Sequence, residues 1–272
     1  MSSSALRIAV PGAAGRMGRM LIRLVSENPA LQLGVATERA GSPEIGQDAG
    51  LLAGVSPLGV RVVTADAELT ADVVVDFTAP GATAGLVRRA AEAGLGIVVG
   101  TTGLGDDERG AIERAAERVP IVWAANMSLG VNVLFGLLRQ AATILGEDYD
   151  VEIVEAHHRH KKDAPSGTAL AIAGVIADAL HRDPAKDLRH GREGNVGPRE
   201  RREIGIHAMR GGDIVGDHTV YFCGMGERLE LTHRASSRET FARGALRAAE
   251  WLRDRDPGLY DMQDVLGLRT SR

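Results

Sequence analysis

The feature that most constrains the fold is the alternation of short apolar runs with helical patterns along the first half of the chain. Residues 80–92 and 106–118 have the amphipathic pattern of helices. The apolar runs, each typical of a buried strand, are residues 6–10, 31–36, 60–63, 73–77, 97–99 and 121–124. Strands separated by helices pair in parallel, because a helical crossover returns the chain to the same edge of the sheet. The pattern therefore predicts an α/β domain with a Rossmann-like, doubly wound parallel sheet.

The turn after the first run is rich in glycine and precedes a helical pattern that reaches about residue 27. In such a strand, loop and helix, backbone amides close on a pyrophosphate at the helix N-terminus, and Gly18 lets the helix approach the strand. Turns also collect glycine for steric reasons, so the motif is weak without its context. The candidate cofactor residues of this turn are Gly12, Ala13, Ala14, Gly15, Arg16 and Met17.

Glu38 and Arg39 end the second apolar run, about 20 residues past the glycine turn. A carboxylate at this place accepts hydrogen bonds from the ribose hydroxyls of a dinucleotide. Arg39 can instead pair with a 2′-phosphate, so the sequence permits both NADH and NADPH. The alternative reading of the two residues is an exposed ion pair in a loop.

Ligands of parallel sheets bind beyond the carboxyl ends of the strands. The turns after two later runs are therefore expected to border the cofactor. The alternative is that these turns contain small and polar residues only because turns favour them. For Thr78, which follows a third run, this alternative is nearly as good as a role in cofactor binding. The candidates are Gly100, Thr101, Thr102, Ala124, Ala125, Asn126 and Met127.

From Ser128 the pattern changes. Ser128 can cap a long apolar helix to residue 145, and residues 202–209, 214–223 and 227–233 alternate apolar with polar side chains. This predicts a smaller α+β domain with a mostly antiparallel sheet, one face of which is left for solvent or a subunit partner. A capping box at residues 236–239 opens a last helix, and residues 182–202 read as a loop. The expected domains are residues 1–127, 128–236 and a C-terminal segment, 237–272.

Residues 155–169 concentrate the titratable cations. They hold His157, His158 and His160 and two of the three lysines, Lys161 and Lys162, in a chain with 32 lysines and arginines in total. Lysine and histidine can release a proton, which arginine does not. A strand over 149–157 and a helix over 169–180 flank this stretch, and the turn before the helix contains Ser166, Gly167 and Thr168.

Free amides at the helix start and the cations before it favour one anionic ligand, a phosphate or a carboxylate. A solvated basic turn is the plainer reading. A metal site made by His157, His160 and Asp163 is opposed by the surrounding positive charge, so no metal is expected.

Composition limits the function class. A formal net charge of −4 favours neither nucleic acid nor a membrane surface, and the single Cys223 excludes an intrachain disulfide and a cysteine-based metal site. The start of the chain, residues 1–5, is short and polar rather than a signal sequence. No apolar run is expected to span a bilayer. We expect a cytoplasmic enzyme.

The glycine turn together with Glu-Ala-His-His-Arg-His-Lys-Lys-Asp-Ala-Pro-Ser-Gly-Thr-Ala resembles the 4-hydroxy-tetrahydrodipicolinate (dihydrodipicolinate) reductase family of lysine and diaminopimelate synthesis. The resemblance covers essentially the whole chain. The central motif is highly specific, whereas the glycine turn is not. Pro11, and Lys162 where a neutral side chain is usual, depart from the family pattern.

The resemblance implies a dinucleotide-binding domain, a second domain whose sheet builds a homotetramer, and a last helix that returns to the first domain. It implies a small dicarboxylate substrate and NADH or NADPH as cofactor. His157 and Lys161 correspond to the catalytic residues, and His158, Gly167 and Thr168 to substrate-binding ones. Two other readings remain: a nucleotide-sensing regulator without turnover, and a two-domain dehydrogenase with another substrate.

Overall fold

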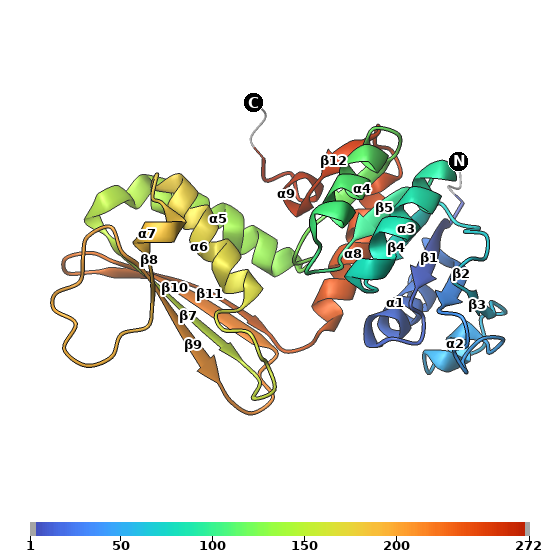
Figure 1. The fold of residues 1–272 in the computed structure, drawn as a ribbon, viewed down its shortest axis with the longest axis horizontal. Coiled ribbons are helices and arrows are strands. Elements are labelled where there is room, and N and C mark those ends of the chain that lie inside the picture. Colours follow the sequence, from blue (N-terminus) through green and yellow to red (C-terminus); the bar gives the residue numbers. More distant parts are fainter. Residues whose placement is uncertain (1–3, 270–272) are drawn as a thin grey trace. The chain divides into compact units, whose positions relative to one another are not determined.

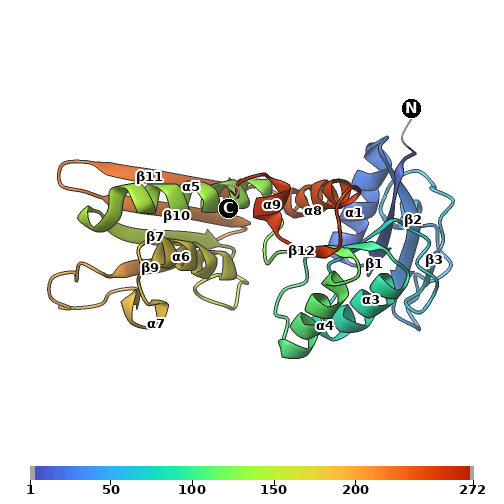
Figure 2. The same ribbon diagram turned by 90° about the horizontal axis from the view of Figure 1, so that it is seen from above.

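The computed structural model describes residues 4–269, which form two compact units (Figures 1 and 2). Unit 1 contains the described residues up to Leu129 and those from Glu239 onward, and unit 2 is Gly130–Arg238. The first three residues of the polar N-terminal stretch lie outside the described residues. The chain thus leaves unit 1 once and returns to it with its C-terminal segment.

Unit 1 is built on a seven-stranded sheet in the order β12-β6-β5-β4-β1-β2-β3. All of its pairings are parallel, which confirms the Rossmann-like α/β prediction. The sequence pattern did not reveal β12, because Leu259 is its only aliphatic residue. The strands are β1 Leu6–Pro11, β2 Leu31–Glu38, β3 Val62–Thr64, β4 Val73–Asp76, β5 Gly96–Val99, β6 Pro120–Trp123 and β12 Gly258–Tyr260.

Helices cover both faces of this sheet. Helices α1 (Arg16–Glu27) and α8 (Glu239–Leu252) share one core with Ile8 and Val10 of β1. Helices α3 (Pro80–Glu92) and α4 (Asp106–Ala116) share a second core that contains Ala9, so neighbouring residues of β1 point to opposite layers. Two short helices, α2 Ala49–Leu52 and α9 Met262–Val265, complete the unit.

Unit 2 has a five-stranded sheet in the order β11-β10-β7-β9-β8. The β11–β10 and β10–β7 pairings are antiparallel, but β7–β9 and β9–β8 are parallel. The sheet is therefore mixed, and the prediction of a mostly antiparallel sheet was wrong in this detail. Alternating side chains reveal the buried face and not the strand direction, and the connection from β7 to β9 contains a helix, as parallel crossovers do. The strands are β7 Asp150–His157, β8 Leu188–His190, β9 Ile204–Arg210, β10 Gly216–Cys223 and β11 Arg228–Ala235.

Two helices, α5 (Leu129–Leu145) and α6 (Gly167–Ala179), pack on one face of this sheet. A 3-10 turn, η1 (Gly146–Asp148), continues α5. The short helix α7 (Pro184–Asp187) and β8 lie in the segment that was predicted to be entirely loop.

The expectation that no apolar run reaches membrane-spanning length was wrong. By length and composition one helix of the described chain, Leu129–Asp148, is long and apolar enough to cross a bilayer. The sequence pattern ended this helix at residue 145, before the turn that extends it. The helix places Leu134, Leu138 and Ala142 in the core of unit 2, and the core helix of a soluble protein passes the same test.

Two polar side chains interrupt the apolar face of the second sheet. Glu155 of β7 and His218 of β10 lie opposite each other in the strand register and are 0% and 3% exposed. His218 Nε2 lies 3.1 Å from Ser166 Oγ, while His218 Nδ1 has no partner among the described residues. Burial, and then the nearby positive charge of His157, lower the pKa of His218 to about 4.

This buried histidine makes stability depend on pH. Below the ordinary pKa of 6.5 the unfolded chain binds a proton at His218 that the folded chain does not bind. Stability should therefore fall as the pH decreases from 6.5 towards 4, by up to roughly 3 kcal/mol. Urea unfolding of wild type and His218→Gln at both ends of this range measures the effect, because the variant lacks the titrating ring. Equal pH dependence in the two proteins would contradict the assignment.

Candidate active site

The glycine loop of unit 1 presents an open helix N-terminus. Gly12 adopts a φ of +66°, a conformation that favours glycine. Gly15 precedes α1 without a side-chain cap, and the first turn of α1 carries no acidic residue. A Cβ at Gly18 would lie 2.2 Å from the carbonyl oxygen of Gly12, so only glycine allows the helix to pack this closely on the loop. The arrangement fits a dinucleotide phosphate at the amides that begin α1.

Glu38 ties the glycine loop to the end of β2. Its Oε2 accepts a hydrogen bond from the Ala14 amide at 3.1 Å, and its Oε1 accepts one from the Arg39 amide at 3.0 Å. The amide of Ala13 donates to the carbonyl oxygen of Thr37 at 3.0 Å. Arg39 itself is exposed. The acidic and the basic candidate therefore stand side by side at the carboxyl end of β2.

Asp76, at the end of β4, is a structural residue of this edge that sequence reasoning did not single out. Its fully buried carboxylate accepts hydrogen bonds from the Thr78 hydroxyl at 2.6 Å and the Thr83 hydroxyl at 2.7 Å. Thr78 Cγ2 would lie 3.2 Å from a Cβ at Gly12. Thr78 thus lies against the glycine loop, between strands β1 and β4, where the strand order reverses. A lone aspartate at the end of an apolar run was the available signal.

The remaining cofactor candidates follow β5 and β6. A Cβ at Gly100 would lie 2.4 Å from the Phe77 ring, so glycine is required there. Thr101 is buried and its hydroxyl has no partner among the described residues, whereas Thr102 is exposed. Asn126 Oδ1 accepts a hydrogen bond from the Ser128 amide at 2.9 Å. Ala124 and Ala125 begin this turn, and Met127 is buried at its end. All cofactor candidates thus lie at the carboxyl ends of strands in one sheet. The Thr101 hydroxyl, which has no partner among the described residues, and the N-terminus of α1, which has no side-chain cap, fit a nicotinamide dinucleotide.

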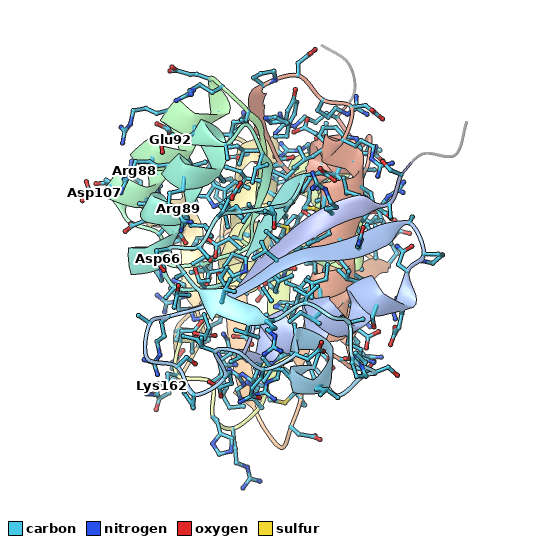
Figure 3. All side chains as sticks on the ribbon, turned by 90° about the vertical axis from the view of Figure 1, so that its right-hand side faces the viewer. Asp66, Arg88, Arg89, Glu92, Asp107 and Lys162 are labelled. Carbon is cyan, nitrogen blue, oxygen red and sulfur yellow. The ribbon has the colours of Figure 1, made fainter. Side chains whose placement is uncertain are left out.

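In unit 2 the cationic stretch begins where β7 ends, at His157. Lys161 Nζ lies 2.9 Å from Asp163 Oδ2, and the Lys161 side chain is 21% exposed. Lys162 is exposed and lies at the periphery in Figure 3. The two adjacent lysines therefore differ in environment. The His158 and His160 rings are 6.2 Å apart, so these imidazoles belong to the same cluster.

Helix α6 begins directly after this cluster. Ser166 is its N-cap residue, and Ser166 Oγ accepts a hydrogen bond from the Ala169 amide at 3.1 Å. Gly167 is exposed and Thr168 is partly buried at the first helical positions. The first turn of α6 carries no acidic residue. The predicted combination of cations with a helix N-terminus is therefore present within one unit.

Three further residues shape this cluster. Partial burial, and then the positive charge of Arg238, lower the pKa of His158. Arg210 donates two hydrogen bonds of 2.8 Å to the Glu155 carboxylate and a third, of 2.7 Å, to the carbonyl oxygen of Asp163. The sequence analysis gave Glu155 no role. The contact between Glu155 and Arg210 spans 55 positions, which no local pattern encodes.

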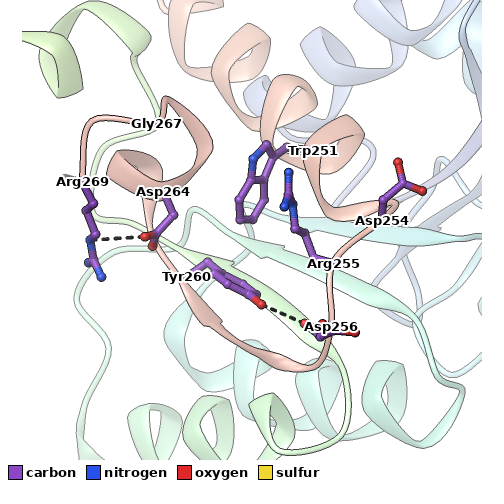
Figure 4. Close-up of a pocket in the computed structure, with 8 residues that line it drawn as sticks. All are labelled: Trp251, Asp254, Arg255, Asp256, Tyr260, Asp264, Gly267 and Arg269. Atoms are coloured by element: carbon purple, nitrogen blue, oxygen red, sulfur yellow. Dashed lines mark hydrogen bonds and ion pairs between the residues drawn. The ribbon is translucent and has the colours of Figure 1, made fainter. Parts of the chain in front are cut away.

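Two further observations concern metal binding and a cavity in unit 1. Within residues 4–269 no group of three or more His, Cys, Asp or Glu side chains is arranged to hold a metal ion. A cavity of about 270 Å³ lies in the C-terminal segment of unit 1 (Figure 4). Arg255 stacks over the Trp251 ring there, 4.2 Å from its centroid, and Tyr260 packs edge-on against Trp251. None of the candidate site residues lines this cavity.

Comparison with known proteins identifies the family. Residues 6–127 match the model for the N-terminus of dihydrodipicolinate reductase, and residues 130–266 match the model for its C-terminus. The chain is 56% identical over 268 residues to the 4-hydroxy-tetrahydrodipicolinate reductase of Anaeromyxobacter dehalogenans strain 2CP-1, covering 98% of this chain and 99% of that protein. It is 53% identical to the reductase of the same name from Alkalilimnicola ehrlichii, with 96% and 99% covered.

Solved structures agree on the fold. The dipicolinate-bound dihydrodipicolinate reductase from Paenisporosarcina sp. TG-14 matches with a TM-score of 0.75 at 24% identity, covering 96% of this chain and 98% of that one. An amine dehydrogenase from Mycobacterium smegmatis matches with a TM-score of 0.61 at 15% identity, covering 98% of each chain. The identities over the full length and the match of both family models show that the chain belongs to the dihydrodipicolinate reductase family of NAD(P)H-dependent oxidoreductases.

Proposed function

We propose that the chain reduces 4-hydroxy-tetrahydrodipicolinate to tetrahydrodipicolinate in diaminopimelate and lysine biosynthesis. The relatives that carry this name match almost the entire chain at more than half of its positions. The reaction adds a hydride and a proton to the substrate ring and releases its hydroxyl group as water. The main support for the proposal is that His157, Lys161 and the start of α6 belong to one cationic cluster. The substrate carries two carboxylates, and such a cluster attracts negative charge.

Unit 1 holds the dinucleotide in this proposal. Bound NADH or NADPH supplies the hydride. The amides of Gly12 to Met17 bind its phosphates, and Glu38 and Arg39 bind the adenosine ribose or its 2′-phosphate. The turns after β5 and β6 border the nicotinamide, and the buried Thr101 hydroxyl is available there as a hydrogen-bonding partner.

Unit 2 binds the substrate and provides the proton. His157 and Lys161 form the donor pair, and each stands beside a carboxylate, Glu155 at 2.6 Å and Asp163 at 2.9 Å. His158, with Gly167 and Thr168 at the start of α6, binds substrate carboxylates, and Arg238 adds positive charge near His158. A regulator that only senses nucleotide has no use for such a donor pair, which disfavours that reading.

Replacing Lys161 tests the donor pair. Lys161→Ala should lower kcat by about 10²–10⁴-fold, the usual contribution of general acid catalysis, while NADH still binds. The assay follows loss of reduced-nicotinamide absorbance with substrate formed freshly from pyruvate and aspartate semialdehyde by the preceding synthase. Lys162→Ala is the matched control, because Lys162 is adjacent and exposed, and it should turn over normally. Wild type that binds cofactor but shows no turnover would favour the nucleotide sensor.

Replacing Arg39 tests the role of the second ribose residue. A charge-assisted hydrogen bond to a 2′-phosphate contributes about 1.5–3 kcal/mol, so Arg39→Ala should raise the KM for NADPH by about tenfold or more. The KM for NADH serves as the internal control and should change little, since NADH lacks that phosphate. Equal changes for both cofactors would show that Arg39 does not read the 2′ position.

We also propose a cytoplasmic homotetramer built through the second sheet. Helices α5 and α6 cover one face, while Glu152, His207 and Tyr221 lie on the other face, which no helix covers within the described residues. Light scattering of the purified chain should give four times its mass of 28.7 kDa. A monomer mass at assay concentration would reject the assembly, and recovery in the membrane fraction of lysed cells would reject the location.

A further inference from the structure

Glu155 lies directly behind His157 and is surrounded by donors. Its carboxylate is 0% exposed, and Oε2 lies 2.6 Å from His157 Nδ1. Arg210 donates one hydrogen bond to each carboxylate oxygen, and the Ser166 amide donates to Oε1 at 2.9 Å. A carboxylate has about four lone-pair positions for hydrogen bonds. The Glu155 carboxylate is therefore fully occupied, and the His157 ring is one of its fixed partners.

The charge of Glu155 determines which nitrogen of His157 carries a proton. Burial alone would raise the pKa of Glu155, but the hydrogen bonds from Arg210, His157 and the Ser166 amide outweigh burial and lower it. An ionised carboxylate only accepts hydrogen bonds. The short contact therefore requires an N–H at His157 Nδ1, which leaves Nε2 as the nitrogen that exchanges a proton with a ligand.

The surroundings of His157 Nε2 differ from those of Nδ1. No hydrogen-bond partner for Nε2 occurs among residues 4–269. A Cβ at Gly216 of β10 would lie only 3.1 Å from Nε2, so a larger residue would crowd this edge of the ring. The His218 ring packs edge-on against His157, with the centroids 5.2 Å apart, and limits tilting of the imidazole. The carboxylate at Nδ1 and the glycine beside Nε2 thus leave Nε2 as the one ring nitrogen without a hydrogen-bond partner among the described residues.

We propose that Glu155 is a positioning residue that commits Nε2 of His157 to the substrate and balances the charge of the protonated ring. The inference rests on the proposed function, in which His157 belongs to the proton donor. Arg210 holds Glu155 through both carboxylate oxygens and also binds the carbonyl oxygen of Asp163. The ion pair between Glu155 and Arg210 therefore fixes the position of the His157 ring and also the position of the turn that leads into α6.

The charged groups around His157 explain why this carboxylate matters. Glu155 faces the ring from its own strand, Arg210 from β9 and His218 from β10. The following turn contributes Lys161 and Asp163, which are paired with each other. Glu155 is the one anion in direct contact with the imidazole among the described residues. Without Glu155, no carboxylate among the described residues would contact the imidazole directly.

Glu155→Gln tests the role with little change in shape. The amide of glutamine can donate to Nδ1 and so stabilise the wrong tautomer, and it does not balance a protonated ring. We expect kcat to fall on the order of 10²-fold, within the range for loss of an acid catalyst, with unchanged NADH affinity. The basic limb of the pH profile of kcat should move to lower pH, a change that a merely structural role would not produce.

Glu152→Gln is the matched control. Glu152 lies on the same strand, and its carboxylate contacts His207 Nε2 at 2.7 Å as well as Arg192 and Arg199. It faces the opposite side of the sheet from the His157 cluster, so its variant should keep the wild-type pH profile. If Glu155→Gln also keeps wild-type kcat and pH profile, the positioning role is overturned.

Two further variants separate this inference from the proposed function. His157→Gln with wild-type turnover would reject His157 as donor, and the positioning role with it. Loss of turnover in His157→Gln together with a normal Glu155→Gln would reject the positioning role alone. If circular dichroism shows that Glu155→Gln does not fold, Gly216→Ala replaces it, because its Cβ crowds Nε2. We expect that variant to lose at least about tenfold in kcat with unchanged KM for NADH, and a wild-type kcat would overturn the assignment of Nε2.

Discussion

The ion pair between Glu155 and Arg210 joins three parts of unit 2 that are distant in sequence. It links the end of β7 to β9 and, through Asp163 and Ser166, to the start of α6. A buried pair of this kind adds little net stability, since desolvation of the charges offsets their attraction, but removal of one partner costs about 3–5 kcal/mol. Placement is the better explanation of the pair, because the same carboxylate holds the His157 ring. In the proposed function, the orientation of the His157 donor and the placement of the helix start that binds the substrate therefore depend on one contact.

In unit 1, the corresponding constraint is close backbone packing at the glycine loop rather than an ion pair. The backbone of α1 reaches the glycine loop at Gly18, where a side chain would overlap the carbonyl oxygen of Gly12. The same approach leaves the first amides of α1 facing the carboxyl edge of the sheet, where Glu38 and the turns after β5 and β6 also end. In the proposed function, cofactor binding therefore relies on backbone geometry in unit 1, whereas substrate protonation relies on paired charges in unit 2.

Much of this could be predicted from the sequence, because the signals are local. Alternating apolar runs predicted the parallel sheet, and Ser166 before an alanine-rich run predicted the start of α6. Long-range pairing could not be predicted. The parallel partnership of β7 and β9, and the contact of Glu155 with Arg210, join residues some fifty positions apart. The sequence also did not show that the side chains of Lys161 and Lys162 have different environments. The difference arises because the turn brings Asp163 into contact with Lys161.

We propose that this chain transfers a hydride from reduced nicotinamide to a ring that its own residues bind and protonate. Isotope transfer tests it most directly. Turnover with NADH deuterated at C4 of the nicotinamide, in ordinary water, should give tetrahydrodipicolinate that is heavier by one mass unit when the transferred position carries the label. The same reaction with unlabelled NADH in heavy water should place deuterium from the solvent in the product. Oxidation of NADH without transfer of the label to the product would contradict the account.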